Sequence, residues 1–251
     1  MFYQSSKNQC VMKFFQTIKN NIPNTITCLN LVSGCLAIIF AFNYDKCYGA
    51  LHGYEMVYIC IAAAAVFDFF DGMMARLLHA YSSLGKELDS LSDLVSFGVA
   101  PGMLMWNTIL LNTCEGVFSP WIVASLAIPV FAALRLAKFN IDDSQTTSFI
   151  GLPVPANALF WIGVCAWMHA NSTFFTPWIM AIVMVLFSSL MVSRLHMFSL
   201  KFKNLAFADN FVRYVLIVGA VIFIVSYQAA GLAWTIITYI LLSIVTRNKT
   251  I

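Results

Sequence analysis

Four of the eleven acidic residues of this chain lie in one short stretch, residues 67–93, between two strongly apolar regions. They are Asp68, Asp71, Asp89 and Asp93. An aspartate in a membrane helix costs about 2.5–3.5 kcal/mol to insert at mid-bilayer, and nearby carboxylates also repel one another. Hard divalent cations such as Mg²⁺ or Mn²⁺ relieve that repulsion, because they prefer carboxylate oxygens and keep positions open for water or phosphate. We therefore predict that these aspartates bind divalent cations.

The four aspartates fall on two helix faces. At about 100° per residue, Asp68 and Asp71 share one arc of their helix, and Asp89 and Asp93 share one arc of the next. The short linker between the arcs predicts an antiparallel hairpin that can turn the acids toward each other. Small residues lie on the same arcs and leave room for a bulky ligand; they are Gly72, Ala75 and Gly85. Two cations about 3.5–4 Å apart would form the usual clamp for displacement at phosphorus.

Roles without a bound metal also fit these residues. The aspartates could form ion pairs or cap helices at a membrane interface, and the small residues could serve close helix packing. A cation transporter could use the acids as a proton or ion relay. A relay predicts acids spread through the depth of the membrane, whereas these four gather at the edge of two apolar stretches.

The elements that carry these residues are predicted to be membrane-spanning helices. The chain is 61% hydrophobic and 10% charged, whereas a soluble domain is about half apolar and a quarter charged. A crossing helix needs about 20 mostly apolar residues. The sequence predicts an all-α, polytopic membrane bundle of about eight transmembrane helices, at residues 24–43, 51–78, 87–112, 119–139, 153–170, 176–194, 210–228 and 230–246.

The basic residues predict the orientation of this bundle. With eight spans, thirteen of the fourteen lysines and arginines fall on the side of the N-terminus, and Lys46 alone falls on the other. The positive-inside rule then places both termini in the cytoplasm. The net charge of +3 follows from this topology and gives no reason to expect a nucleic-acid partner. Residues 1–22 are expected to form a cytoplasmic or interfacial segment, and residues 23–251 one transmembrane domain.

The aspartate stretch resembles the signature of the CDP-alcohol phosphatidyltransferase family. It reads Asp68-x-x-Asp71-Gly72-x-x-Ala75-Arg76, then eight residues, then Gly85-x-x-x-Asp89-x-x-x-Asp93. Members of this family transfer a phosphatidyl group from a CDP-linked lipid to an alcohol and release CMP. The resemblance implies a catalytic centre that uses Mg²⁺ or Mn²⁺, with two ions.

The resemblance also implies roles for individual residues. The metal ligands would be Asp68, Asp71 and Asp89, and Asp93 would act as the general base and also touch the second metal. Residues at the CDP-diacylglycerol site would be Gly72, Ala75, Arg76 and Gly85. Asn24 and Thr27, which open the first span, could hydrogen-bond the nucleotide, although capping of the first helix turn accounts for them equally well.

Flanking segments resemble the bacterial and archaeal branch of the family that uses L-serine as the acceptor. They are Ile22-Pro23-Asn24 with Thr27 and Asn30, LDSLSDLVSFGVAP (88–101), RLAKFN (135–140) and GLPVPANA (151–158). Residues expected near the serine are Arg135, Lys138 and Asn140, with anchoring to lipid headgroups as the alternative for the two cations. The resemblance further implies a homodimer in a prokaryotic cytoplasmic membrane, surrounded by membrane lipid, with the site facing the cytoplasm.

An acceptor that carries a phosphate is the alternative within the family. Glycerol 3-phosphate or inositol phosphate should require a denser basic cluster than Arg135 and Lys138 supply. We therefore expect serine as the acceptor, with phosphatidylserine and CMP as the products.

Overall fold

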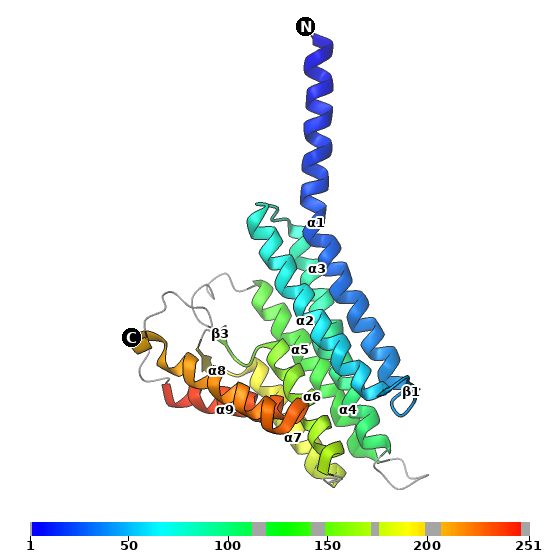
Figure 1. The fold of residues 1–251 in the computed structure, drawn as a ribbon, viewed down its shortest axis with the longest axis vertical. Helices are drawn as coiled ribbons and strands as arrows, with labels where there is room; N and C mark the ends of the chain where they lie inside the picture. The colour runs from blue at the N-terminus through cyan, green and yellow to red at the C-terminus, as the bar shows by residue number, and fades with distance from the viewer. Residues whose placement is uncertain (1, 112–118, 142–148, 172–175, 199–206, 247–251) are drawn as a thin grey trace.

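The computed structural model describes the backbone of residues 2–111, 119–141, 149–171, 176–198 and 207–246, and the side chains from residue 21 onward except those of 149 and 207–209. Helices dominate these ranges, in agreement with the predicted all-α membrane fold (Figure 1). The helices are α1 (Phe2–Phe42), α2 (Gly53–Leu77), α3 (Ser83–Asp93), α4 (Ala100–Leu111), α5 (Ala127–Ile141), α6 (Val154–Asn171), α7 (Pro177–Val192), α8 (Phe207–Tyr227) and α9 (Gly231–Thr246).

Short elements join or extend these helices. A π-helix, η1 (Leu94–Val99), connects α3 to α4, and two 3₁₀ segments, η2 (Pro120–Leu126) and η3 (Gln228–Ala230), precede α5 and α9. Two antiparallel two-residue ladders lie between helices: β1 (Cys47–Tyr48) pairs with β2 (Leu51–His52), and β3 (Phe149–Ile150) pairs with β4 (His196–Met197).

Five of the described helical segments are long and apolar enough to cross a membrane. They are Asn21–Phe42, Gly53–Leu77, Ser83–Leu111, Pro120–Ile141 and Asn210–Thr246, and Pro177–Val192 is a shorter apolar helix. Helices cover most of each of the eight segments expected from the sequence, and the number of crossings stays a prediction. The last candidate, Asn210–Thr246, comprises most of α8 and all of α9, which pack side by side and run across the direction of α1 to α5 (Figure 1).

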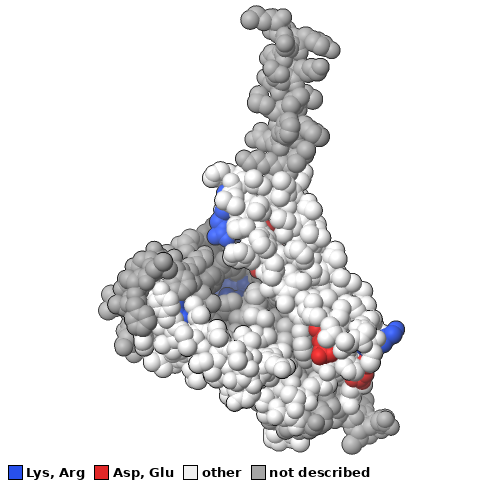
Figure 2. All heavy atoms as spheres, viewed as in Figure 1, with Lys and Arg blue, Asp and Glu red and all other residues white. Residues whose placement is uncertain are grey.

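The helix that opens the chain continues beyond the expected start of the first span. Backbone hydrogen bonding extends α1 from Phe2 through Pro23, so no break in the helix marks the expected boundary at residue 22. The side chains of residues 1–20, and residues 142–148 and 199–206 between predicted spans, lie outside the described residues. Figure 2 shows a broad surface without charged side chains between two zones that carry them, one toward the extended end of α1 and one at the opposite end of the bundle.

The hairpin between α2 and α3 is fixed by local backbone geometry. His79 adopts a left-handed φ of 49° just after α2, and the N–H of Ala80 reaches back to the carbonyl of Ala75 at 3.0 Å. Such a left-handed residue ends the helix and satisfies its last carbonyls. The Ser82 hydroxyl then caps α3 by accepting a 2.9 Å hydrogen bond from the N–H of Gly85. The chain thus reverses in five residues and sets the two predicted acidic arcs against each other.

The helix α1 lies against the hairpin and completes this end of the bundle. A Cβ at Gly34 would come within 2.8 Å of the backbone of Ser96, so only glycine permits this approach of α1 to η1. Two serine hydroxyls bridge the same interface: Ser92 donates to the carbonyl of Thr27 at 3.2 Å, and Ser96 donates to the carbonyl of Asn30 at 3.0 Å. The tight contact places a third helix beside the acidic arcs.

Candidate metal centre

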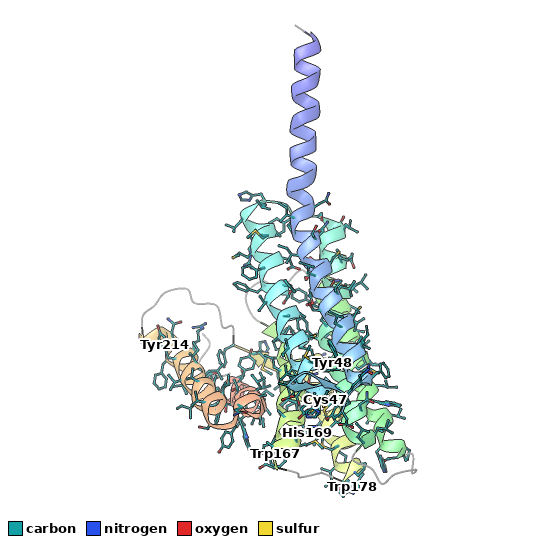
Figure 3. The ribbon with its side chains drawn as sticks, turned by 45° about the vertical axis from the view of Figure 1, so that its right-hand side comes forward. Cys47, Tyr48, Trp167, His169, Trp178 and Tyr214 are labelled. Carbon is teal, nitrogen blue, oxygen red and sulfur yellow. The ribbon has the colours of Figure 1, made fainter. Side chains whose placement is uncertain are left out.

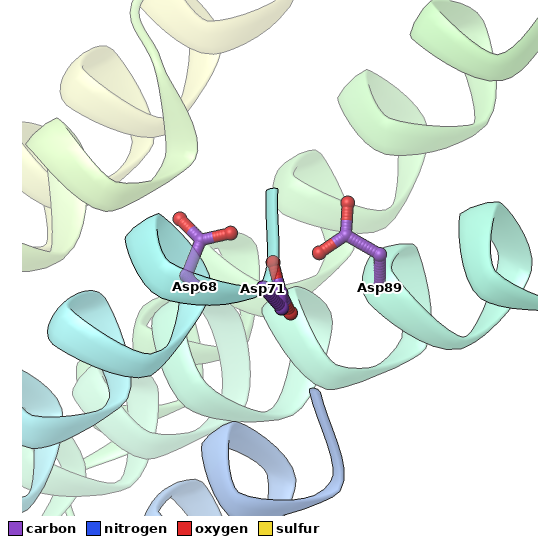
Figure 4. Close-up of side chains that lie close together, drawn as sticks. All are labelled: Asp68, Asp71 and Asp89. Carbon is purple, nitrogen blue, oxygen red and sulfur yellow. The ribbon is translucent and has the colours of Figure 1, made fainter. Parts of the chain in front are cut away.

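Three of the four predicted ligands converge in the structure. Asp68 and Asp71 project from α2 and Asp89 projects from the facing α3, with Asp71 between the other two (Figure 4). One carboxylate oxygen from each lies within 4.8 Å of the others. Asp71 is 5% exposed, and Asp68 and Asp89 are partly buried. The facing arcs predicted from helical periodicity are therefore confirmed for these three residues.

The donor set fits a hard divalent cation. Asp71 Oδ2 and Asp89 Oδ1 are buried and have no hydrogen-bond partner among the residues that the structure describes. Unpaired buried carboxylate oxygens are costly, and like charges at this distance repel each other by roughly 3–4 kcal/mol per pair at an effective dielectric constant near 20. An Mg²⁺ or Mn²⁺ ion removes both costs, because its ligands are oxygen atoms of this kind.

Asp93 lies one turn further along α3, beside this trio. It is the last residue of α3, and its carboxylate is within electrostatic range of Asp68 and Asp89. Its Oδ1 accepts a 3.2 Å hydrogen bond from the side-chain amide of Asn30, which comes from α1. This contact connects Asp93 to α1.

The small residues predicted on the two arcs have different surroundings. A Cβ at Gly72 would meet only the Arg76 guanidinium, at 3.7 Å, so there is open space beside it. A Cβ at Gly85 would lie 3.0 Å from both Asn24 Oδ1 and Ser82 Oγ. Gly72 therefore leaves room next to the acids, whereas Gly85 also permits close packing against α1.

The remaining predicted nucleotide ligands lie at the same end of the bundle. Arg76, in the last turn of α2, is exposed and donates from Nε to the carbonyl of Gly72 at 2.8 Å. Ala75 is partly buried on the same turn. Thr27 is buried beside Asp71, and its hydroxyl donates to the carbonyl of Pro23 at 3.0 Å.

Two of the three residues expected near serine line a shallow surface hollow with room for about one water molecule. Arg135 and Lys138 line it together with Phe139 and the ends of β3 and α7. The Arg135 Nη1 donates to the carbonyls of Ile150 and Met191 at 2.8 and 3.0 Å. Arg135 thus ties α5 to β3 and to the end of α7, while Lys138 is exposed.

The third of these residues, Asn140, contacts the acidic helix instead. Its amide donates to the Ser90 hydroxyl at 2.9 Å, and its backbone carbonyl accepts from Lys86 Nζ at 3.1 Å. Both partners belong to α3. The cytoplasmic end expected for α5 is therefore attached to the helix that carries Asp89.

Asn30 contacts Asp93, and the sequence analysis did not assign it to the site. It belongs to the segment that resembles other family members, but no role followed from its position there. The signal in the sequence was its spacing, because Asn24, Thr27 and Asn30 are polar residues three apart in an apolar span. Which of them reaches an aspartate depends on the packing of α1, which the spacing leaves undetermined.

The fold and the site together define a helical membrane protein with a carboxylate cluster, able to hold a metal ion, between two antiparallel helices. The family model for CDP-alcohol phosphatidyltransferases matches residues 20–191, from the start of the first apolar span through most of α7. The chain belongs to the CDP-alcohol phosphatidyltransferase family. The helices α8 and α9 lie outside the matched region.

Curated relatives agree with this assignment. The chain is 34% identical over 235 residues to a CDP-diacylglycerol–serine O-phosphatidyltransferase of Mycobacterium leprae, covering 87% of this chain and 72% of that protein. It is 38% identical over 176 residues to the protein of that name in Bacillus subtilis, covering 70% of this chain and 89% of the relative. A third protein of that name, from Methanocaldococcus jannaschii, is 37% identical over 144 residues, covering 57% and 60%.

Proposed function

We propose that this protein transfers the phosphatidyl group of CDP-diacylglycerol to the hydroxyl of L-serine and releases phosphatidylserine and CMP. The observation that carries the proposal is the convergence of Asp68, Asp71 and Asp89 on the family signature. The serine acceptor is supported by the relatives from bacteria and an archaeon, all of which are named for that reaction.

The three converging carboxylates would hold the divalent cation, Mg²⁺ or Mn²⁺, with Asp93 as a further ligand if a second ion binds. When bound, such a cation supplies Lewis-acid stabilisation of negative charge on a diphosphate. The protein's own contribution is to fix the carboxylates on two rigid helices, so that a cation would be held in one place relative to the diphosphate. The open space at Gly72, together with Ala75 and Gly85, would receive the cytidine, while the acyl chains remain in the lipid.

Polar groups around this space would orient the nucleotide. Arg76 is exposed at the end of α2 and would approach the phosphates. Asn24 faces Gly85, and Thr27 lies beside Asp71, so both are placed to hydrogen-bond a nucleotide from α1.

Asp93 would act as the general base for the acceptor. Serine's hydroxyl is a poor nucleophile at neutral pH, and a positioned base typically contributes about 10²–10⁴-fold to such a step. The Asp93 carboxylate takes the hydroxyl proton as the serine oxygen attacks the phosphatidyl phosphorus. The new bond to the serine oxygen forms, the bond to the bridging oxygen breaks, and CMP leaves with that oxygen. A single in-line displacement predicts inversion at phosphorus.

The cationic side chains of Arg135 and Lys138 would recognise the carboxylate of serine at this surface. Because Arg135 Nη1 is already engaged with two carbonyls, the exposed Lys138 is the freer cation for a ligand. Asn140 would act at the same edge, through its contact with Ser90. A phosphate-bearing acceptor would need more positive charge than these residues provide.

We place the enzyme in a prokaryotic cytoplasmic membrane, with the site and both termini facing the cytoplasm. The segregation of basic residues supports this orientation. A homodimer, inferred from the family, belongs to the same proposal.

The test is a purified 251-residue chain in detergent, supplied with CDP-diacylglycerol, Mg²⁺ or Mn²⁺, and one labelled alcohol at a time. Serine should give phosphatidylserine and stoichiometric CMP. Product from glycerol 3-phosphate or inositol phosphate, with none from serine, would overturn the acceptor and keep the reaction class.

A further inference from the structure

Asn30 is a buried amide that touches the acidic site from a helix without any of the four aspartates. It is 0% exposed in α1, and its Nδ2 donates to Asp93 Oδ1 at 3.2 Å. Its Oδ1 has no hydrogen-bond partner among the described residues. A buried amide oxygen without a hydrogen bond costs free energy of folding, so packing alone does not account for an asparagine at this position.

The backbone around Asn30 is held rigidly. Its own carbonyl accepts the hydrogen bond from Ser96, and the carbonyl of Thr27, one turn earlier, accepts from Ser92. Gly34, one turn later, lies against Ser96 at a distance that excludes any side chain. The close approach of Gly34 to the backbone of Ser96 sets where the Asn30 amide can reach, and that point is the Asp93 carboxylate.

The chemistry of this contact suits a carboxylate that must accept a proton. Asp68 and Asp89 lie within electrostatic range of Asp93 and repel it. An amide N–H is neutral and cannot lose its proton, so it orients one oxygen without giving Asp93 a competing proton or a full charge. With Oδ1 engaged by Asn30, the second oxygen of Asp93 is left to receive a proton.

We propose that Asn30 is a positioning residue that holds the Asp93 carboxylate in the orientation required of the general base. This inference rests on the proposed function, because it needs Asp93 to take the acceptor's proton. Hydrogen-bond partners of this kind in ligand shells typically change function by about 10–100-fold when they are removed. The alternative is that Asn30 only joins α1 to α3.

The experiment tests two variants that remove the donor: Asn30→Leu keeps the bulk of the side chain and Asn30→Ala does not. Their control is Ser96→Ala. The control removes a hydrogen bond at the same helix interface, the one to the Asn30 carbonyl, without touching a carboxylate. Four quantities are measured on the full chain in detergent: kcat, KM for CDP-diacylglycerol, the affinity for Mn²⁺ in the absence of substrate, and Tm.

Both Asn30 variants should lose about 10–100-fold in kcat, with KM and Mn²⁺ affinity changed by less than about threefold. Ser96→Ala should keep kcat within about twofold of the wild-type value, even if its Tm falls as far as the Tm of the Asn30 variants. Unchanged kcat in Asn30→Ala, or an equal loss of kcat in Ser96→Ala, would overturn the inference. So would a loss of Mn²⁺ affinity that parallels the loss of kcat, because Asn30 would then act on the metal ligands.

The two proposals can fail separately. Wild-type turnover with an alcohol other than serine would overturn the acceptor, and the ratio of variant to wild-type kcat would then be measured with that alcohol. A wild-type chain that forms phosphatidylserine, together with an Asn30→Ala variant of equal kcat, would overturn the role of Asn30 alone.

Discussion

The side chain of Asn140, at the end of α5, donates a 2.9 Å hydrogen bond to the hydroxyl of Ser90, the residue that follows Asp89. This bond connects the segment expected to contact serine with the helix that carries a metal ligand. If Asn140 acts through Ser90, Asn140→Ala and Ser90→Ala should raise KM for serine by similar factors. The double variant should then be no worse than either single one. Steady-state kinetics at saturating CDP-diacylglycerol measure this, and additive effects would indicate direct contact of Asn140 with serine.

Replacing Asp93 should separate binding from turnover. We expect Asp93→Asn to retain CDP-diacylglycerol binding and lose about 10²–10⁴-fold in kcat, because the amide cannot accept the hydroxyl proton. Equilibrium binding of the lipid and initial rates of CMP release measure the two effects. A variant with wild-type turnover would remove the assigned role of Asp93.

Neutralising one member of the converging trio should have opposite effects on stability with and without metal. Because the three carboxylates repel one another, Asp89→Asn should raise the Tm of the chelator-treated protein. It should also remove most of the increase in Tm that Mg²⁺ or Mn²⁺ gives the wild type. Thermal unfolding in detergent, with and without metal, measures both changes. Glu87, which is exposed on the same helix, supplies the matched control Glu87→Gln.

The open space beside Gly72 predicts a defect in binding without a defect in folding. Gly72→Ala meets only the Arg76 guanidinium, at 3.7 Å, so Tm should fall by no more than a few degrees. The added methyl would occupy the space assigned to the cytidine, and KM for CDP-diacylglycerol should rise at least tenfold. Gly219→Ala in α8, where a Cβ would meet only Phe223 at 3.9 Å, is the control and should leave KM unchanged.

A polar cluster at the opposite end of the bundle should matter for stability alone. The Tyr44 hydroxyl lies 2.6 Å from His169 Nε2 and 2.9 Å from Thr108 Oγ1, and Tyr54 stacks on His169 with ring centroids 4.1 Å apart. Figure 3 shows His169 near Cys47 and Tyr48, at the end of the bundle away from the N-terminus. Tyr44→Phe should cost roughly 1–3 kcal/mol, because it leaves buried partners unpaired.

The cost of Tyr44→Phe should be the same from neutral to mildly alkaline pH. Burial raises the pKa of the Tyr44 hydroxyl far above its usual range, so the hydroxyl stays protonated there. A raised pKa in the folded state means that stability would be lost only as the pH approaches values where tyrosine ionises. Chemical unfolding at several pH values measures this, while kcat should stay within about twofold. A large fall in kcat would connect this end of the bundle to the reaction.

Much of the protein's class follows from its sequence. The scarcity of charge and the length of the apolar stretches indicate a helical membrane protein, because a continuous apolar stretch of about 20 residues has the length of a membrane-spanning helix and satisfies its backbone hydrogen bonds within itself. Helical periodicity placed Asp68 and Asp71 on one arc and Asp89 on another, and the structure confirmed that these arcs face each other. These features are local, so residue type and spacing are sufficient to predict them.

Contacts between distant segments needed the tertiary structure. The sequence grouped four aspartates as ligands, whereas helix packing brings three within 4.8 Å and gives Asp93 a partner in α1. The Nη1 of Arg135 donates hydrogen bonds to the carbonyls of Ile150 and Met191. The spacing of residues in the sequence could not predict these contacts. The physical reason is that a helix's own periodicity sets the direction of each side chain, while its distance from another helix depends on how closely the two backbones pack. Here that distance is set by pairs such as Gly34 and Ser96, which are 62 positions apart in the sequence.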